Sequence, residues 1–298
     1  MARAPLLLAL VVAVAVVMAS SLGHGASAAQ PPVACGLSFD FYRRTCPRAE
    51  SIVRDFVREA PPGRGSSTPN LTLRPSAFKA VNDIRDRLEH ECRGAVVSCA
   101  DILALAARDS VVVSGGPDYR VPLGRRDSRR FATRQDVLSD LPAPSSNVPS
   151  LLALLRPLGL DATDLVTISG GHTVGFKGTC PAKGTDQRTV LDVRTPNVFD
   201  NQYYVDLVNR EGLFVSDQDL FTNDITRPIV ERFARSQRDF FEQFGVSMGK
   251  MGQMRVRTSE LGEVRRNCSA RNPGPTVDAL QWPSLVQTIV DAAAERLG

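Results

Sequence analysis

The sequence predicts a secreted, mainly α-helical protein, and three observations support this. Apolar residues recur at helical spacing through most of the chain, whereas the alternating pattern of strands is weak. An apolar run, Leu6–Met18, precedes Ala26-Ser27-Ala28, which together are typical of a cleaved targeting segment over residues 1–29. All six cysteines follow that segment, which indicates an oxidising compartment. The apolar run is too short to span a bilayer comfortably and no second one follows, so we expect no membrane anchor.

Composition is that of an ordinary globular protein. The chain carries a net charge of +4 and 43% hydrophobic residues, and no basic run alternates with aromatic side chains. Nucleic acid is therefore not an expected partner. The part that remains after cleavage, residues 30–298, is long enough for one large domain or two modest ones.

Helical periods appear in order along the chain. We expect helices from Cys46-Pro47 to Arg58, Ser76–Cys92, Cys99–Asp109, Pro149–Arg156, a short one capped by Asp161 or Thr163, Asn201–Asn209, one or two over Thr226–Met251, and a last one beyond Pro275. Ser98 and Asp101 are predicted to form a capping box. The helix that follows them is apolar nearly all round and should be buried.

Two stretches are predicted to be irregular. Pro, Gly and Ser dominate residues 61–70, which we expect to form a loop. Residues 121–144 lack a clear period and contain a basic cluster, Arg125 to Arg130, which is most simply a solvated salt-bridge loop.

The segment Asp161–Phe176 reads DATDLVTISGGHTVGF and holds His172 directly after two glycines. Glycines let the backbone turn sharply or pass close to something flat and large. A histidine in apolar surroundings suits a metal ligand, since one imidazole nitrogen can bind a metal while the other needs a partner. On this window alone, a core histidine with satisfied hydrogen bonds is the simpler interpretation.

The motifs FYRRTCP, VSCADILALAARDSVVVSGGP, VPLGRRDS, LPAP, SGGHT, LDVRTPNVFDNQYY, GLFVSDQDLF and VRRNCS occur in this order between Leu37 and Ser269. In this set the chain resembles the secreted plant haem peroxidases (class III). The resemblance implies a mainly α fold with haem b between two domains: a distal part (30–140), a proximal part (141–270) and a C-terminal tail (271–298). It also implies a monomer in the extracellular space or cell wall. The implied reaction is hydrogen peroxide reduction coupled to one-electron oxidation of small phenolic donors.

The resemblance assigns roles to individual residues. His172 becomes the proximal haem-iron ligand, and Asp217 in SDQDL accepts a hydrogen bond from its other nitrogen, although in isolation Asp217 would be a turn residue. Pro142 in LPAP becomes a contact for aromatic substrates through its carbonyl; otherwise LPAP is a rigid connector. The implied calcium ligands are Thr173, Asp192, Thr195, Val198 and Asp200, against the alternative of a loop with a helix cap at Asp200.

One departure from the family bears on this calcium set. The family has a longer connection between Phe176 and Cys180, and the shortening is expected to affect the position of Thr173 and His172 relative to the calcium loop.

Cysteine spacing alone cannot choose among fifteen pairings. The resemblance pairs Cys46 with Cys92 and Cys99 with Cys268. It leaves Cys35 and Cys180, which are free, mispaired or joined to each other.

Two sequons, at Asn70 and Asn267, are predicted glycosylation sites. Asn70 also falls near the family asparagine that supports a distal histidine, so a sugar site and a catalytic relic both remain open.

The sequence departs from the family where the chemistry of peroxide cleavage lies. Between the first helix and NLTLRP the family carries a long helix with RLHFHDCF, followed by GCDGS, and neither is present here. The distal histidine and arginine are thus missing, and only His24, His90 and His172 occur in the chain. We therefore expect a haem peroxidase scaffold without its distal helix and with impaired turnover. The alternatives are an active peroxidase, and a non-catalytic haem-binding or haem-free glycoprotein remnant, including a product that never folds.

Overall fold

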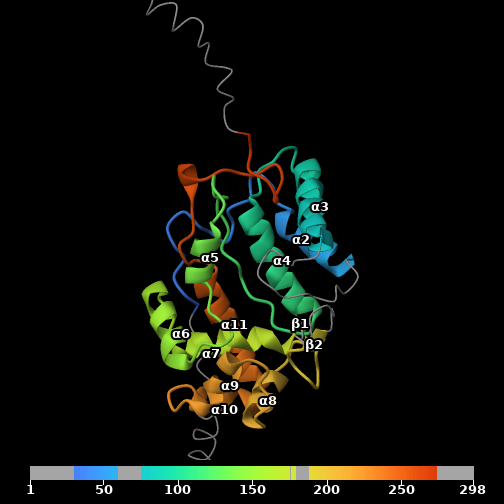
Figure 1. Cartoon of the computed structure of the whole chain (residues 1–298). Coiled ribbons are helices and arrows are strands. Elements are labelled where there is room, and N and C mark those ends of the chain that lie inside the picture. Colours follow the sequence, from blue (N-terminus) through green and yellow to red (C-terminus); the bar gives the residue numbers. More distant parts are fainter. Residues whose placement is uncertain (1–29, 60–74, 175, 179–187, 274–298) are drawn as a thin grey trace, which may run out of the picture.

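The computed structural model describes residues 30–59, 75–174, 176–178 and 188–273 (Figure 1). The predicted targeting segment, the loop at 61–70 with Asn70, Cys180 and the last predicted helix lie outside these residues. Helices dominate the described part. Its two-stranded sheet pairs β1 (Phe176–Gly178) with β2 (Arg188–Val190) in antiparallel fashion, with Phe176 opposite Val190. No described helix combines the length and the apolar character needed to cross a membrane.

Three helices pack together in the N-terminal half (Figure 1). They are α2 (Ala49–Glu59), α3 (Pro75–Glu91) and α4 (Cys99–Val113). All three were expected from their apolar periods. Each of the three pairs in this group is in contact, and Ile52, Ile84 and Ile102 are buried between them.

Two disulfides tie this group together, as the resemblance implied. Cys46, just before α2, is joined to Cys92, just after α3. Cys99, the first residue of α4, is joined to Cys268, so the end of the described chain is anchored to the start of a buried helix. Among the described cysteines Cys35 is free, and it is exposed.

A second group of helices forms the C-terminal half (Figure 1). Its members are α6 (Val148–Leu155), the 3-10 turn η2 (Arg156–Leu158), α7 (Ala162–Ser169), η3 (Gly170–Thr173), α8 (Gln202–Val208), α9 (Val215–Thr222), α10 (Arg227–Arg235) and α11 (Gln237–Met251). The segment between residues 226 and 251 is therefore two helices. Neither α9 nor the short α5 (Arg134–Asp140) was predicted. A last 3-10 turn, η4, spans Ser259–Leu261.

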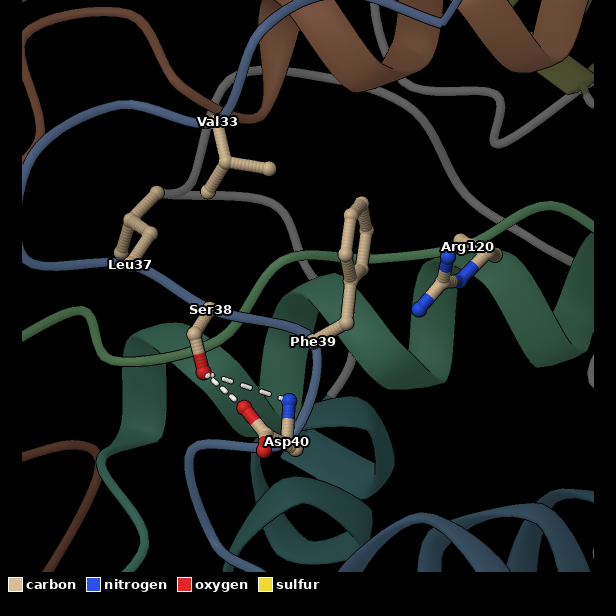
Figure 2. Close-up of a pocket in the computed structure, with 6 residues that line it drawn as sticks. All are labelled: Val33, Leu37, Ser38, Phe39, Asp40 and Arg120. Atoms are coloured by element: carbon tan, nitrogen blue, oxygen red, sulfur yellow. Dashed lines mark hydrogen bonds between the residues drawn. The ribbon is translucent and has the colours of Figure 1, made fainter.

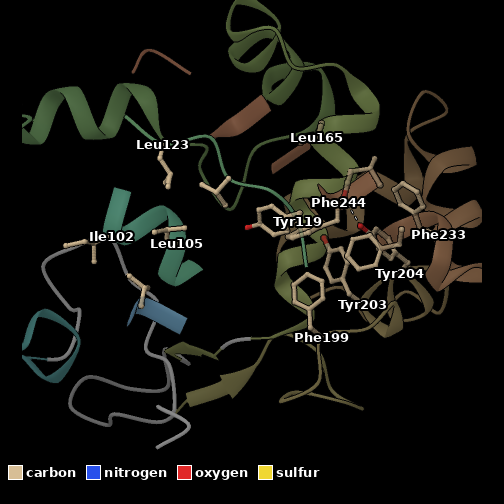
Figure 3. Close-up of a cluster of buried hydrophobic side chains, with 14 of the residues drawn as sticks. Ile102, Leu105, Tyr119, Leu123, Leu165, Phe199, Tyr203, Tyr204, Phe233 and Phe244 are labelled. Carbon is tan, nitrogen blue, oxygen red and sulfur yellow. Dashed lines mark hydrogen bonds between the residues drawn. The ribbon is translucent and has the colours of Figure 1, made fainter. Parts of the chain in front are cut away.

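The buried core runs through both groups (Figure 3). On one side it is aliphatic, with Ile102 and Leu105 of α4 fully buried. On the other it is a cluster of buried rings: Phe199, Tyr203, Tyr204, Phe233, Phe240 and Phe244. Tyr119 joins the two sides, with its ring centroid 6.0 Å from that of Phe244 in an edge-to-face contact.

The prediction that the apolar helix after Ser98 is buried is confirmed only in part. Ile102 and Leu105 are completely covered, but Leu103 is 53% exposed and Val113 is 52% exposed. The helix instead uses part of its buried surface for charge, because the Arg108 guanidinium donates to the Asp109 carboxylate there. Part of the apolar surface of α4 is therefore exposed at Leu103 and Val113.

The basic cluster is not the solvated loop that its charges suggested. Arg125 is 6% exposed and donates to Asp101 Oδ1 at 2.8 Å. Asp127 is also buried and accepts hydrogen bonds from the N–H groups of Cys99 and Ala100, at the free N-terminus of α4. Arg129, in contrast, is exposed.

The capping box predicted for α4 forms only in part. Ser98 Oγ accepts the Asp101 N–H at 3.1 Å, as expected of an N-cap. Asp101 does not return the bond. Its carboxylate accepts from Tyr42, Gly124 and Arg125 instead. A residue that would cap a helix in isolation is thus used to hold three separate segments together.

Candidate functional site

The site begins with the helix that delivers His172. Asp161, rather than Thr163, caps α7, and it forms a full capping box with Asp164: each carboxylate accepts the backbone N–H of the other residue, at 2.9 and 3.0 Å. The helix ends at Ser169 and tightens into η3, which carries His172. The capping box thus fixes the start of α7, and through this short helix the position of η3 and His172.

The two glycines before His172 are needed for different reasons. A Cβ on Gly170 would lie 2.1 Å from the Tyr204 hydroxyl and 2.6 Å from the Phe240 ring, so protein packing requires glycine there. A Cβ on Gly171 would meet no atom of the described residues within 4 Å. The sequence predicted that these glycines serve either a turn or the approach of something flat, and Gly171 leaves room for the second.

His172 is held by a buried carboxylate. Its Nδ1 lies 2.8 Å from Asp217 Oδ1, and Asp217 is only 2% exposed. The rings of Tyr203 and Phe214 pack edge-on against the imidazole, with centroids at 5.9 and 5.6 Å. The His172 side chain is 38% exposed, and no described residue hydrogen-bonds its Nε2. A carboxylate on Nδ1 favours the tautomer with a bare Nε2, the form that binds a metal.

Asp217 is held in turn by two further donors. It is the third residue of α9, and its Oδ2 accepts the Phe214 N–H at 3.1 Å. Its Oδ1 accepts the Tyr203 hydroxyl at 2.9 Å. Complete burial, and after it the charge of Asp217, holds the pKa of Tyr203 well above its usual value of 10.0. The phenol is therefore neutral at any physiological pH and can always donate.

The five residues of the predicted calcium set converge on one point. Thr173 and Asp192 are fully buried. The Thr173 hydroxyl lies 3.1 Å from Asp192 Oδ2, 3.1 Å from Asp200 Oδ1 and 3.4 Å from the Val198 carbonyl. The Thr195 hydroxyl lies 3.1 Å from the same two carboxylate oxygens. Thr173 thus lies with the other residues of the predicted set.

This oxygen cluster fits a hard cation. Two hydroxyls make four contacts of 3.1 Å to carboxylate oxygens, yet they carry only two protons between them. Two negative groups are also brought to the same pair of hydroxyls, which is unfavourable without a positive charge. Carboxylate, hydroxyl and main-chain oxygens are the donors that calcium prefers. The set holds two carboxylates, and the described residues contain no cluster of three or more His, Cys, Asp or Glu side chains arranged for a metal.

The cap assigned to Asp200 as the alternative is also present. Asp200 Oδ1 accepts the Gln202 N–H at 2.9 Å, at the start of α8. The two interpretations therefore do not exclude each other, because the same carboxylate oxygen contacts the hydroxyl pair and the helix.

The remaining predicted site residues lie on the surface. Pro142 is exposed, and the loop that carries it is pinned beside the site because Pro144 accepts the Ser216 N–H at 3.0 Å, one residue before Asp217. Asn267 is exposed and its side chain accepts the Ser269 N–H at 2.8 Å. Asn267 is therefore accessible to a glycosylating enzyme.

A separate pocket of about 450 Å³ lies near the start of the described chain (Figure 2). Phe39 and Arg120 stand side by side in it, with the guanidinium carbon 3.8 Å from the ring centroid. Ser38 and Asp40 are linked by a 2.7 Å hydrogen bond. None of the residues that line this pocket belongs to the His172–Asp217 pair or to the oxygen cluster.

Sequence reasoning missed the contribution of Tyr203 and Tyr204. Both phenols are buried beside the glycine pair and Asp217, and both hydroxyls have fixed partners. The available signal was two adjacent tyrosines in the first turn of a predicted helix directly after Asp200, since buried tyrosines usually find a partner for the hydroxyl.

Comparison with known proteins gives consistent matches. The family model described as Peroxidase matches residues 49–236. Cationic peroxidase SPC4 of Sorghum bicolor is 55% identical over 333 residues, with 91% of each chain covered. Peroxidase 12 of Arabidopsis thaliana is 43% identical over 84% of this chain and 87% of its own. Peroxidase 66 of Zea mays is 37% identical over 78% and 89%. The matched stretch of the sorghum protein is longer than the 298 residues of this chain, so that relative contains residues with no counterpart here.

Proposed function

This chain belongs to the plant peroxidase family, and we propose that it is a secreted haem protein whose turnover of hydrogen peroxide is impaired. Members of this family are haem enzymes that reduce hydrogen peroxide at the expense of a donor substrate. The observation that carries our proposal is that the His172–Asp217 pair is formed while the chain has no further histidine suited to act as a distal base.

His172 is the residue that would hold haem iron, through Nε2. Asp217 fixes the tautomer and makes the imidazole a stronger donor, because it accepts the proton at Nδ1. Gly171, which precedes His172 in the chain, leaves space for a flat group. Haem, when bound, supplies the iron at which peroxide is reduced. Calcium would be held by the oxygen cluster around Thr173 and Asp192, next in the chain to His172.

The opposite side of the haem needs two further groups. Peroxide cleavage needs a base that takes a proton from one oxygen and returns it to the other, and a cation that stabilises the developing charge. The chain has three histidines. His24 lies in the predicted targeting segment, and His90 is exposed in the last turn of α3. His172 is already paired with Asp217. None is left to act as the base.

Two observations support the loss of a helix from the distal part. The aligned stretch of the sorghum relative exceeds the length of this chain. In addition, the exposed apolar side of α4 at Leu103 is what a removed neighbour would leave behind. General acid–base catalysis is worth about 10²–10⁴ in rate, and one electrostatic donor about 10²–10³. Loss of both groups therefore leaves a protein that can bind haem but turns over peroxide very slowly.

We place this protein outside the cell or in the cell wall, as a monomer that meets hydrogen peroxide and small phenols, with the Pro142 loop as the donor contact. Asn267 is an exposed glycosylation site in this proposal. A haem-free secreted glycoprotein is the second candidate, and it is favoured by the uncovered side of α4. Haem content of the secreted product decides between the two.

The first experiment tests the ligand. The full chain is secreted from a plant cell line, and haem is measured by its Soret absorbance. We expect a stoichiometric band that His172→Ala abolishes and His90→Ala leaves intact, because His90 is the other histidine of the mature chain. A band that survives His172→Ala would refute the ligand assignment, and absence of any band would favour the haem-free glycoprotein.

The second experiment tests the impairment. The haem-loaded protein is mixed rapidly with hydrogen peroxide, and oxidation of a small phenol such as guaiacol is followed beside the sorghum peroxidase. We expect a rate at least ~10²-fold lower, since one missing general base alone has that effect. A rate equal to that of the sorghum enzyme would show that other residues supply the distal base and cation.

A further inference from the structure

One oxygen of Asp217 serves two donors. Oδ1 lies 2.8 Å from His172 Nδ1 and accepts the Tyr203 hydroxyl at 2.9 Å. The second oxygen accepts the Phe214 N–H. Three donors therefore reach this buried carboxylate, and the imidazole shares Oδ1 with the Tyr203 phenol.

We propose that Tyr203 is a positioning residue for the His172–Asp217 pair: it fixes the orientation of the carboxylate and limits how strongly the carboxylate draws the imidazole proton. The inference concerns the strength of His172 as a ligand, and to that extent it rests on the proposed function.

The orienting role follows from where the bonds point. The Phe214 N–H holds Oδ2 from within α9, whereas the Tyr203 hydroxyl holds Oδ1 from the neighbouring α8. With both oxygens fixed, the Asp217 carboxylate has little freedom to rotate, so Oδ1 stays on the side of His172. Because Asp217 is held from both α8 and α9, it fixes the imidazole ring of His172 more firmly than it would if it were held from α9 alone.

The limiting role follows from hydrogen-bond chemistry. A donor to a carboxylate stabilises its charged form and makes it a weaker base. Because the phenol donates to the same oxygen that His172 uses, it reduces the pull on the Nδ1 proton. The imidazole then carries less negative character and is a weaker electron donor at Nε2. Tyr203 thus sets a ligand strength below the one that Asp217 would impose by itself.

Tyr203 is itself firmly placed. It is 2% exposed, its ring packs against His172 and Tyr204, and Asp200 caps the turn on which it lies. Tyr204 provides a matched comparison. It is equally buried on the same helix, but its hydroxyl donates to the Val166 carbonyl at 3.1 Å and does not contact Asp217. A change at Tyr204 therefore disturbs the same core without touching the pair.

The test compares Tyr203→Phe with Tyr204→Phe in two states of the full mature chain. In the haem-free protein, the His172 Nδ1–H proton is observed by ¹⁵N-edited NMR and assigned with the help of His90→Ala. We expect Tyr203→Phe to move this resonance downfield, because the hydrogen bond to Asp217 strengthens, and Tyr204→Phe to leave it in place. In the Asp217→Ala background, Tyr203→Phe should add nothing.

The haem-loaded protein gives a second readout, the ferric/ferrous potential. A stronger ligand favours the ferric form. We expect the equilibrium preference for ferric over ferrous haem to rise about tenfold in Tyr203→Phe, which shifts the potential by ~59 mV to more negative values for a one-electron couple. Equal potentials and equal Nδ1–H resonances in the two variants would overturn the inference while the proposed function stands. Failure to bind haem would overturn the proposed function, and the NMR comparison would still decide the role of Tyr203.

Discussion

The described residues of 30–140 and those of 141–270 both bury charged side chains, but they use them differently; we call these two regions the distal and proximal parts, in line with the proposed function. In the distal part, Asp101 accepts from Tyr42, Gly124 and Arg125, and Arg108 bonds Asp109 and the Tyr119 carbonyl. These groups join segments of the chain to one another. In the proximal part, Asp217 contacts His172, the proposed iron ligand. Asp192 contacts Thr173, a proposed calcium ligand.

Under the proposed function, the peroxidase scaffold persists without its distal catalytic groups. In the distal part, two disulfides and buried ion pairs link α2, α3 and α4 to one another or to neighbouring segments. The Asp101 carboxylate is engaged by Tyr42, Gly124 and Arg125, whereas Asp109 Oδ2 is buried and has no hydrogen-bond partner in the described part of the chain. In the proximal part, the hydroxyl–carboxylate cluster at Thr173 both caps α8 and offers the oxygen donors that a hard cation prefers.

The largest effect is expected from breaking the distal scaffold. Asp101→Ala leaves Arg125 buried without its carboxylate partner, and the loss of one member of a buried pair costs about 3–5 kcal/mol. Urea denaturation measures this as a lower free energy of unfolding. Asp40→Ala is the control, because Asp40 forms an exposed and long ion pair, 3.8 Å from Arg43, which should contribute little to stability. A loss below ~1 kcal/mol in Asp101→Ala would show that the distal pairs do not hold the scaffold.

Removal of calcium tests the proximal side of the comparison. If the Thr173 cluster binds calcium, a concentration of 100 times the Kd stabilises the folded chain by about 2.7 kcal/mol. We expect calcium to raise the Tm of the wild-type protein and a chelator to lower it. Asp192→Asn should abolish both effects. Asp224→Asn, at a carboxylate that is 91% exposed, should preserve them. A Tm independent of calcium in the wild-type chain would mean that the cluster only caps α8.

The two glycines separate packing from binding. Gly170→Ala forces a methyl group against Tyr204 and Phe240, and overpacking of this kind costs about 1–3 kcal/mol. Gly171→Ala meets no described atom, so the stability of the haem-free chain should hardly change, while its affinity for haem should fall. Thermal denaturation and a haem titration measure the two quantities. Equal stability losses in both variants would contradict this division of roles.

Sequence reasoning found the long helices and the two disulfide pairs, because apolar periods and family motifs are local signals. It missed α9, where VSDQDLFT has no apolar stripe and the helix is held by capping at Asp217 and by its neighbours. It also placed Arg125 in solvent. A run of arginines says nothing about Asp101, the distant partner that makes burial of one of them possible.

The site was predictable in part for the same reason. His172, Asp217 and the oxygen ligands lie in motifs that the family shares, and the structure brings them together. Tyr203 was not singled out, because its role depends on α8 and α9 packing side by side, which no local pattern shows. The exposure of Leu103 on α4 was likewise not predicted, since an apolar sequence indicates burial and does not show which neighbours pack against it.

The smallest effect is expected from a buried pair in the proximal part. Asp164 is fully buried, and burial alone would raise its pKa, but Lys250, the Asp161 N–H and the Ser247 hydroxyl together hold its pKa below 3.8. A carboxyl whose pKa is lower in the folded than in the unfolded chain stabilises the fold above pH 3.8, and this contribution is lost as the pH falls through the folded value.

We therefore expect the wild-type protein to lose more stability than Asp164→Asn between pH 7 and pH 3. Because the Lys250 side chain is 31% exposed, the difference should be at most about 1 kcal/mol, below the effect at the fully enclosed Asp101–Arg125 pair. Denaturation midpoints across this pH range measure it. If the two profiles run parallel, Asp164 contributes through its cap on α7 and not through its charge, and the proximal part would then rely on buried ion pairs less than the distal part does.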